Sequence, residues 1–95
     1  MENTYYEDIV EIVRDLKVNI YDKIDMDKKY ISMDKGNITT IDEYNDLMED
    51  LDFQYNKLQE YSENNSRNKK VYIIMQSMRN TKNDITKMIE EINSL

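Results

Sequence analysis

Apolar residues recur at alternating spacings of three and four along the middle of this chain, from Ile41 to Leu58. That spacing places the apolar side chains on one side of an α-helix, as in the seam of a coiled coil. The preceding stretch, Thr40-Ile41-Asp42-Glu43, has the form of a capping box, which satisfies backbone N–H groups of a first helical turn. The pattern therefore predicts a helix over residues 41–62 that packs its seam against other helices. The seam residues are Ile41, Tyr44, Met48, Leu51, Tyr55 and Leu58, widened by Leu47 and Tyr61.

A second capping box, Thr4-Tyr5-Tyr6-Glu7, precedes another apolar stripe and predicts a helix over residues 5–26. With its flanking residues the stripe covers about half of the helical wheel, so the helix can contact two neighbours. Asp27 would fall in the middle of this stripe. We therefore expect the helix to end or kink between Asp25 and Lys28, with a short helix resuming over residues 28–33. The stripe contains Ile9, Val13, Leu16, Ile20 and Ile24, and its flanks contain Tyr5, Val10, Ile12 and Tyr21.

The last part of the chain predicts a helix over residues 68–94. The polar stretch from Asn80 to Asp84 interrupts its apolar side, so the segment is either one long helix with Thr81 in the core or two helices that meet near Asn80. The five consecutive apolar residues Val71 to Met75 would also suit a buried strand. Continued spacing of three and four favours a helix. Its apolar residues are Val71, Ile74, Met75, Met78, Ile85, Met88, Ile89, Ile92 and Leu95.

Two stretches separate the predicted helices. Gly36 is the only glycine in a chain without proline, and it or Asn37 can adopt the left-handed conformation that ends a helix. The polar stretch 62–68 marks the second connection, where Ser66 or Asn68 can cap the third helix. We predict a single all-α domain over residues 1–95, an antiparallel three-helix bundle with long helices and coiled-coil-like packing that self-associates.

Charge is unevenly distributed along the chain, whose net charge is −7. Residues 35–65 include two basic and eight acidic residues, whereas residues 66–95 include six basic and three acidic residues. Antiparallel packing of the second and third helices would bring the acidic Glu49 and Asp52 near the level of the basic Lys82 and Arg79, which explains the asymmetry. The overall acidity opposes binding to a phosphate backbone, so we expect no nucleic-acid partner.

The residue types on which most enzymes and metal sites depend are missing. The chain has no histidine, no cysteine and one glycine, which excludes Ser-His and Cys-His pairs, histidine or cysteine zinc sites and a phosphate-binding loop. The sequence that starts at Asp25 and Asp27 does not match a calcium-binding loop, because Lys29 stands at the next ligand position and Tyr30 at the glycine position. We predict a non-enzymatic protein without a metal or cofactor.

The composition also bears on location and origin. No apolar run approaches the roughly 18 residues of a membrane span, and acidic residues in MENTYYEDIV stand where a signal peptide has basic ones. We expect an intracellular, cytoplasmic protein that does not bind membranes. Abundant Asn, Ile, Lys and Tyr without Ala or Pro are typical of an A+T-rich coding sequence, such as that of a virus, a phage or a low-G+C bacterium.

Three apolar side chains fall outside the predicted seams. Phe53 points away from the seam of the second helix, and Tyr72 and Ile73 lie outside the apolar arc of the third. Tyr72 and Ile73 must contact the first helix, a second subunit or another protein, whereas a single exposed aromatic side chain such as Phe53 is ordinary. With Lys69 and Gln76, these three side chains form the predicted protein interface, used for self-association or for helix-in-groove binding.

These observations predict a protein–protein interaction module, such as a small viral or phage accessory protein that binds or inhibits a host component through an apolar and tyrosine-rich helix surface. One alternative is an acidic inhibitor that imitates nucleic acid at a basic site of another protein. A second alternative is a structural homo-oligomeric scaffold. The acidic face would contain Asp42, Glu43, Asp46, Glu49, Asp50, Asp52 and Glu60.

Overall fold

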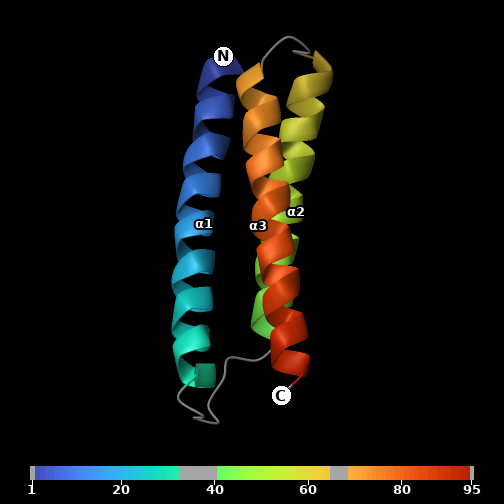
Figure 1. Ribbon diagram of the computed structural model, residues 1–95. Helices are drawn as coiled ribbons and strands as arrows, with labels where there is room; N and C mark the ends of the chain where they lie inside the picture. Colours follow the sequence, from blue (N-terminus) through green and yellow to red (C-terminus); the bar gives the residue numbers. More distant parts are fainter. Residues whose placement is uncertain (1, 33–40, 65–68, 95) are drawn as a thin grey trace.

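The computed structural model describes residues 2–32, 41–64 and 69–94, with side chains described for residues 6–30, 41–63 and 69–94. These residues form three helices, α1 (Glu2–Ser32), α2 (Ile41–Asn64) and α3 (Lys69–Asn93). Figure 1 shows α1 and α3 running in one direction and α2 in the opposite direction, with the two chain ends at opposite ends of a rod. The molecule extends 50 × 19 × 19 Å. The predicted all-α antiparallel three-helix bundle is confirmed.

The core follows the apolar spacing of the sequence. In α2, Tyr44, Leu51 and Leu58 are exposed by 2% or less, whereas the alternate seam residues Met48 and Tyr55 are only half-buried. This heptad alternation arises because one seam position points to the axis of the bundle and the other to its boundary. The remaining members of the buried apolar cluster are Ile9, Val13, Ile20 and Ile24 of α1 and Val71, Met75, Met78, Ile85 and Met88 of α3.

Asp27 lies in the core rather than at the end of a helix. Its exposed fraction is 2%. The Tyr44 hydroxyl donates a hydrogen bond to Asp27 Oδ2 across 2.5 Å, and Lys23 Nζ lies 3.9 Å from the same oxygen. Because α2 supplies a donor to this buried carboxylate, α1 continues as one helix to Ser32. The predicted end or kink near residues 25–28 is therefore wrong. Residues 28–32 of the short helix expected over residues 28–33 are the last part of α1, and Met33 lies outside the described residues.

Thr81 occupies a core position of α3 without interrupting the helix. Its exposed fraction is 0%, and α3 runs continuously through residues 80–84. The Thr81 hydroxyl donates to the Ser77 carbonyl oxygen across 3.0 Å, so its polar group is satisfied within the helix. Tyr21 of α1 lies 3.3 Å from the same hydroxyl and donates to Asp84 Oδ2 across 2.6 Å. Of the two alternatives left open by the sequence, one long helix with a polar core position is correct.

The helix ends differ slightly from the predicted ones. α1 begins at Glu2, so Thr4 lies inside the helix and does not precede it as the predicted capping box requires. α2 continues to Asn64, beyond the predicted start of the loop, and Ser62 is buried with its hydroxyl donating to the Gln59 carbonyl oxygen across 2.8 Å. The predicted turn and cap positions Gly36, Asn37, Thr40, Ser66 and Asn68 lie outside the described residues.

Charged residues link α2 to α3 in part as expected. Lys82 Nζ lies 2.9 Å from Asp52 Oδ1, in agreement with the predicted level of these two residues along the bundle. Arg79 instead donates to the Tyr55 hydroxyl, with its Nε 2.9 Å away and its guanidinium carbon 5.4 Å from the ring centroid. Both contacts lie on the surface, where such pairs contribute little to stability. These contacts follow from the antiparallel register of α2 and α3, which the apolar core determines.

Candidate protein-binding site

Four of the five predicted interface residues share the outer side of α3. Lys69, Tyr72, Ile73 and Gln76 are all exposed, and they follow one another at helical spacing on that side. Tyr72 is 50% exposed and Ile73 is 68% exposed. Helix α1 therefore buries neither Tyr72 nor Ile73, the two side chains that lie outside the predicted apolar arc of α3.

The run of five apolar residues in α3 is divided between the core and the surface. Val71 and Met75 are buried, with exposed fractions of 0% and 6%. Ile74 is half-buried and packs against the core from the side that faces α1. The two residues between Val71 and Ile74 are left on the surface because a helix turns by about 100° at each residue.

Phe53 lies on a different part of the molecule from the exposed residues of α3. It is 59% exposed and lines a groove between α1 and α2. Its neighbour Asp52 pairs with Lys82, which is about 15 Å farther along α3 than Tyr72 at 1.5 Å per residue. The structure thus does not bring Phe53 together with the other predicted interface residues.

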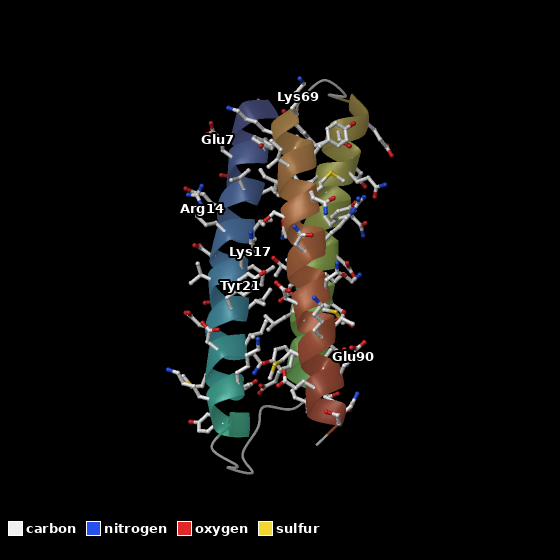
Figure 2. The ribbon with its side chains drawn as sticks, in the orientation of Figure 1. Glu7, Arg14, Lys17, Tyr21, Lys69 and Glu90 are labelled. Atoms are coloured by element: carbon white, nitrogen blue, oxygen red, sulfur yellow. The ribbon has the colours of Figure 1, made fainter. Side chains whose placement is uncertain are left out.

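A groove between α1 and α3 has a volume of about 560 Å³. Figure 2 shows Lys17 and Tyr21 extending from α1 toward α3, with Arg14 on the outer side of α1. Lys17 donates a hydrogen bond to the Ser77 hydroxyl and so crosses the groove. The groove is lined by Val10, Val13, Arg14, Lys17, Val18, Tyr21, Asp22, Ile74 and Ser77.

Ile73 stands beside this groove. It precedes Ser77, a lining residue, by one helical turn, so the two side chains lie on the same side of α3. On α1, Val18 is a lining residue that is 54% exposed. The groove is therefore continued outward by exposed apolar side chains from both helices.

A second groove, between α1 and α2, has a volume of about 310 Å³. Gln54 of α2 is 8% exposed, and its Oε1 has no hydrogen-bond partner among the residues that the structure describes. Ile12, at the α1 side, is 45% exposed. The groove is lined by Ile12, Asp15, Leu16, Asn19, Asp50, Phe53 and Gln54.

Most residues of these two grooves were missed by the sequence reasoning, which searched for apolar seams. Gln54 could have been noticed in the sequence. It lies seven residues after Leu47 and seven before Tyr61, on the side of α2 that widens the seam, and it is the polar residue among these three. Val18 could also have been noticed, because it is an apolar residue outside the main stripe of α1, one turn after Arg14. The sequence does not show which helix packs beside either residue.

Three of the seven predicted acidic residues lie at the edges of the exposed side of α2, where they meet the other helices. All seven are exposed, but Glu43 accepts a hydrogen bond from Lys23 of α1 across 2.6 Å, and Asp52 pairs with Lys82 of α3. Asp50 lines the groove between α1 and α2. Glu43 and Asp50 thus lie on the flank of α2 that meets α1, and Asp52 lies on the flank that meets α3.

Three tyrosines between helices hold their protons more tightly than usual. Burial, followed by the hydrogen bond to Asp27 and the nearby negative charge, raises the pKa of Tyr44 far above 10.0. Burial also raises the pKa of Tyr21, with its hydrogen bond to Asp84 as the next cause, and the pKa of Tyr6, which stacks on Tyr61 with ring centroids 5.5 Å apart. These shifts mark packing contacts between helices.

Within its described residues, the structure brings together no group of acidic residues suited to a metal ion. Asp25 and Asp27, the start of the failed calcium-loop pattern, lie within α1 rather than in a loop. No cluster of three or more candidate metal ligands occurs within residues 2–32, 41–64 and 69–94.

Comparison of the chain with protein-family models, curated proteins and solved structures finds no match. Among the helices in the described part of the chain, none has both the length and the apolar character needed to cross a membrane.

Proposed function

We propose that this protein is a non-enzymatic module that binds another protein through the groove between α1 and α3. The occupant is one amphipathic helix of the partner, whose apolar side chains enter the groove. The observation that carries this proposal is the open groove of about 560 Å³ with Val10, Val13 and Ile74 among its lining residues.

The exposed apolar residues around the groove support this function. Val18 is 54% exposed and Ile73 is 68% exposed, although the bundle already buries a core of its own. A partner helix that covers both side chains would gain stability from removing their apolar surface from water, at roughly 25 cal/mol for each Å². Apolar side chains spaced by three and four on the partner would match the direction of α1 and α3.

The charged residues of the groove would set the orientation of the partner. Asp22 lies at one end of the lining of α1, and Arg14 and Lys17 lie near its middle. An acidic residue on the partner helix would favour the middle of the groove, and a basic residue the end with Asp22. Such complementarity directs orientation and association rate more than affinity.

The experiment is site-specific photo-crosslinking from position 18 or 73, followed by identification of the attached protein and calorimetric titration of that protein. The double variant Val18→Ser with Ile73→Ser is expected to weaken binding at least tenfold, while Met26→Ser leaves it unchanged. Met26 is a matched control, because it is 55% exposed on α1 and is not among the groove residues. Equal affinity of wild-type protein and the double variant would contradict the proposal.

Two further measurements distinguish the alternatives. Light scattering over a dilution series shows whether the attached protein is a second copy of this chain, and a stable homo-oligomer that the double variant abolishes would support a scaffold instead. Titration at several salt concentrations separates apolar from ionic binding. A steep loss of affinity with salt would favour the acidic inhibitor that imitates nucleic acid.

A further inference from the structure

One row of residues along α1 has an order that is symmetric about its centre. The row runs at four-residue spacing through Val10, Arg14, Val18, Asp22 and Met26. Residues four apart are neighbours on a helix surface, so these side chains form one ridge. On each side of Val18 the ridge carries first a charged residue and then an apolar one, and the two charges have opposite signs. Such a ridge is complementary to a second, antiparallel copy of itself.

The charges of the ridge determine this pairing. When two copies of α1 meet antiparallel at Val18, Arg14 of each copy lies beside Asp22 of the other. A parallel arrangement would place like charges together, which is unfavourable. Both charged side chains are exposed, and neither forms an ion pair with another described residue. Figure 2 shows Arg14 on the outer side of α1, where a second copy can reach it.

The apolar residues of the ridge also remain in contact with water. Val18 is 54% exposed and Met26 is 55% exposed, whereas Val10 is half-buried. In the antiparallel pair the two Val18 side chains meet at the centre, and each Met26 lies beside Val10 of the other copy. Removing these apolar surfaces from water favours the association.

Two further acidic residues favour a crossed pair of helices over an aligned one. Glu11 and Asp25 are exposed and lie seven residues before and after Val18, so they are on the same side of α1. In two aligned helices, Glu11 of one copy would meet Asp25 of the other. Helices that pack along rows of four-residue spacing instead cross at about 50°, which moves these carboxylates apart.

The direction of the ridge carries the second helix over the α1–α3 groove. Val10 and Arg14 are lining residues of this groove, whereas Met26 is not. The ridge therefore approaches α3 as it runs toward the N-terminal end of α1. Because a crossing helix is tilted in the same direction as the ridge, the C-terminal half of the second α1 extends across α3.

This crossing brings the second α1 over Ile73, which is 68% exposed. Met26 lies about 12 Å from Val18 along its helix. At a crossing of about 50°, that length corresponds to roughly 8 Å back along α1 and roughly 9 Å sideways, about the distance between packed helices. Lys17 of α1 donates a hydrogen bond to Ser77 of α3, so these two residues are level. About five residues back from Val18 is therefore the level of Ile73.

We propose that a second copy of this chain docks on the α1–α3 groove, with the two α1 helices antiparallel and crossing at Val18. A helix of another protein would occupy the same surface, so self-association and partner binding exclude each other. The dimer thereby regulates the groove, a conclusion that rests on the proposed function. The contact is confined to one ridge and the residues beside it, which places it among the small, transient interfaces that separate on dilution.

Single-cysteine variants of the full-length protein test the geometry, because the chain has no cysteine of its own. Val18→Cys should form a disulfide-linked dimer when an oxidant is added, since the two copies of this position are adjacent. Met26→Cys is the control, because its two copies would lie about 20 Å apart at 1.5 Å per residue. Equal yields of linked dimer from the two variants would overturn the antiparallel arrangement.

Charge variants test the pairing between copies. Arg14→Asp and Asp22→Arg each bring like charges together at both pairs, so each should weaken self-association about fivefold in sedimentation equilibrium. An equimolar mixture of the two variants restores opposite charges and should associate more tightly than either variant alone. A mixture that associates no more tightly would overturn the proposal.

A matched control separates the pairing from net charge. Lys87→Asp changes the net charge by the same amount as Arg14→Asp at an exposed position outside the ridge, and it should leave self-association unchanged. Weakening equal to that of Arg14→Asp would show general repulsion and overturn the pairing. Circular dichroism of each variant in dilute solution should match that of the wild-type protein, because every substituted charge is exposed.

This inference and the proposed function can fail separately. Wild-type protein that remains monomeric up to millimolar concentration would overturn the dimer, whereas photo-crosslinking to another protein would still support the proposed function. A dimer with the expected disulfide, but without capture of another protein, would support the inference and contradict the proposed function. A dimer that persists at nanomolar concentration would overturn its transient character and favour the homo-oligomeric scaffold.

Discussion

The Tyr44 hydroxyl donates a hydrogen bond to the Asp27 carboxylate across 2.5 Å, and the two residues are only 0% and 2% exposed. Lys23 joins this contact, with its Nζ 3.9 Å from Asp27 Oδ2 and 4.9 Å from the centroid of the Tyr44 ring. The same Nζ donates to Glu43 across 2.6 Å. A buried carboxylate is thus held between α1 and α2 by a hydroxyl donor from α2 and by the nearby positive charge of Lys23 on α1, which ties the register of α1 to that of α2.

Replacing Tyr44 by phenylalanine should lower the free energy of unfolding by about 1–3 kcal/mol, because the buried Asp27 carboxylate loses a donor that water cannot replace. Urea unfolding followed by circular dichroism measures the change. Tyr55→Phe is the matched control. Its hydroxyl accepts a hydrogen bond from Arg79 at the surface, so the loss there should stay below about 1 kcal/mol. Equal losses in the two variants would contradict the importance of the Asp27 contact.

Stability should fall in alkaline solution. The pKa of Tyr44 in the folded protein is raised above the ordinary 10.0 by burial and by Asp27, so above that pH the unfolded chain releases a proton that the folded protein keeps. The stabilisation is complete below pH 10 and declines as the pH rises toward the raised pKa. Urea midpoints measured from pH 8 to pH 11, values that bracket the ordinary tyrosine pKa, should show this decline. Tyr44→Phe should reduce its slope, and the exposed substitution Tyr72→Phe should not.

Truncating a central side chain of α1 should unfold a large fraction of this small protein. Ile20 is 0% exposed, and Ile20→Ala should cost about 2–5 kcal/mol through lost burial and the cavity left behind. Met26→Ala on the same helix is the comparison, because Met26 is 55% exposed and its truncation should cost less than about 0.5 kcal/mol. Thermal unfolding by circular dichroism distinguishes them, and similar midpoints would show that α1 is not packed as described.

The surface pair Asp52 and Lys82 should contribute little to the stability of the folded protein. Their side chains are 51% and 44% exposed, so a double-mutant cycle of Asp52→Asn and Lys82→Gln should give a coupling energy of less than about 1 kcal/mol. The coupling should shrink further as salt is added. A coupling above 2 kcal/mol would mean that the pair sets the position of α3 rather than following from the core, since it would exceed the usual range for exposed pairs.

The spacing of apolar residues determined most of the fold. The seam from Ile41 to Leu58 predicted α2 and its buried heptad positions. The same reasoning predicted an all-α antiparallel bundle in which Glu49 and Asp52 lie near the level of Lys82 and Arg79. This succeeds because helix periodicity and the need to bury an apolar side are local properties of the chain. The exposure of Tyr72 and Ile73 was likewise foreseeable from their angles on the helix, although what covers them was not.

Only the tertiary structure decided what happens where a polar residue falls on an apolar side. The position of Asp27 on the apolar side predicted that the helix ends or kinks nearby. Instead α1 continues, because Tyr44 of α2 donates a hydrogen bond to the Asp27 carboxylate. Thr81 remains in the core of α3 with its hydroxyl bonded to Ser77, and Gln54 is buried with its Oε1 unpaired among the described residues. The same holds for the two grooves beside α1, whose residues come from helices far apart in sequence. A polar group in a core is stabilised or left unpaired by the side chains that pack against it, and those neighbours are known only once the helices have been placed together.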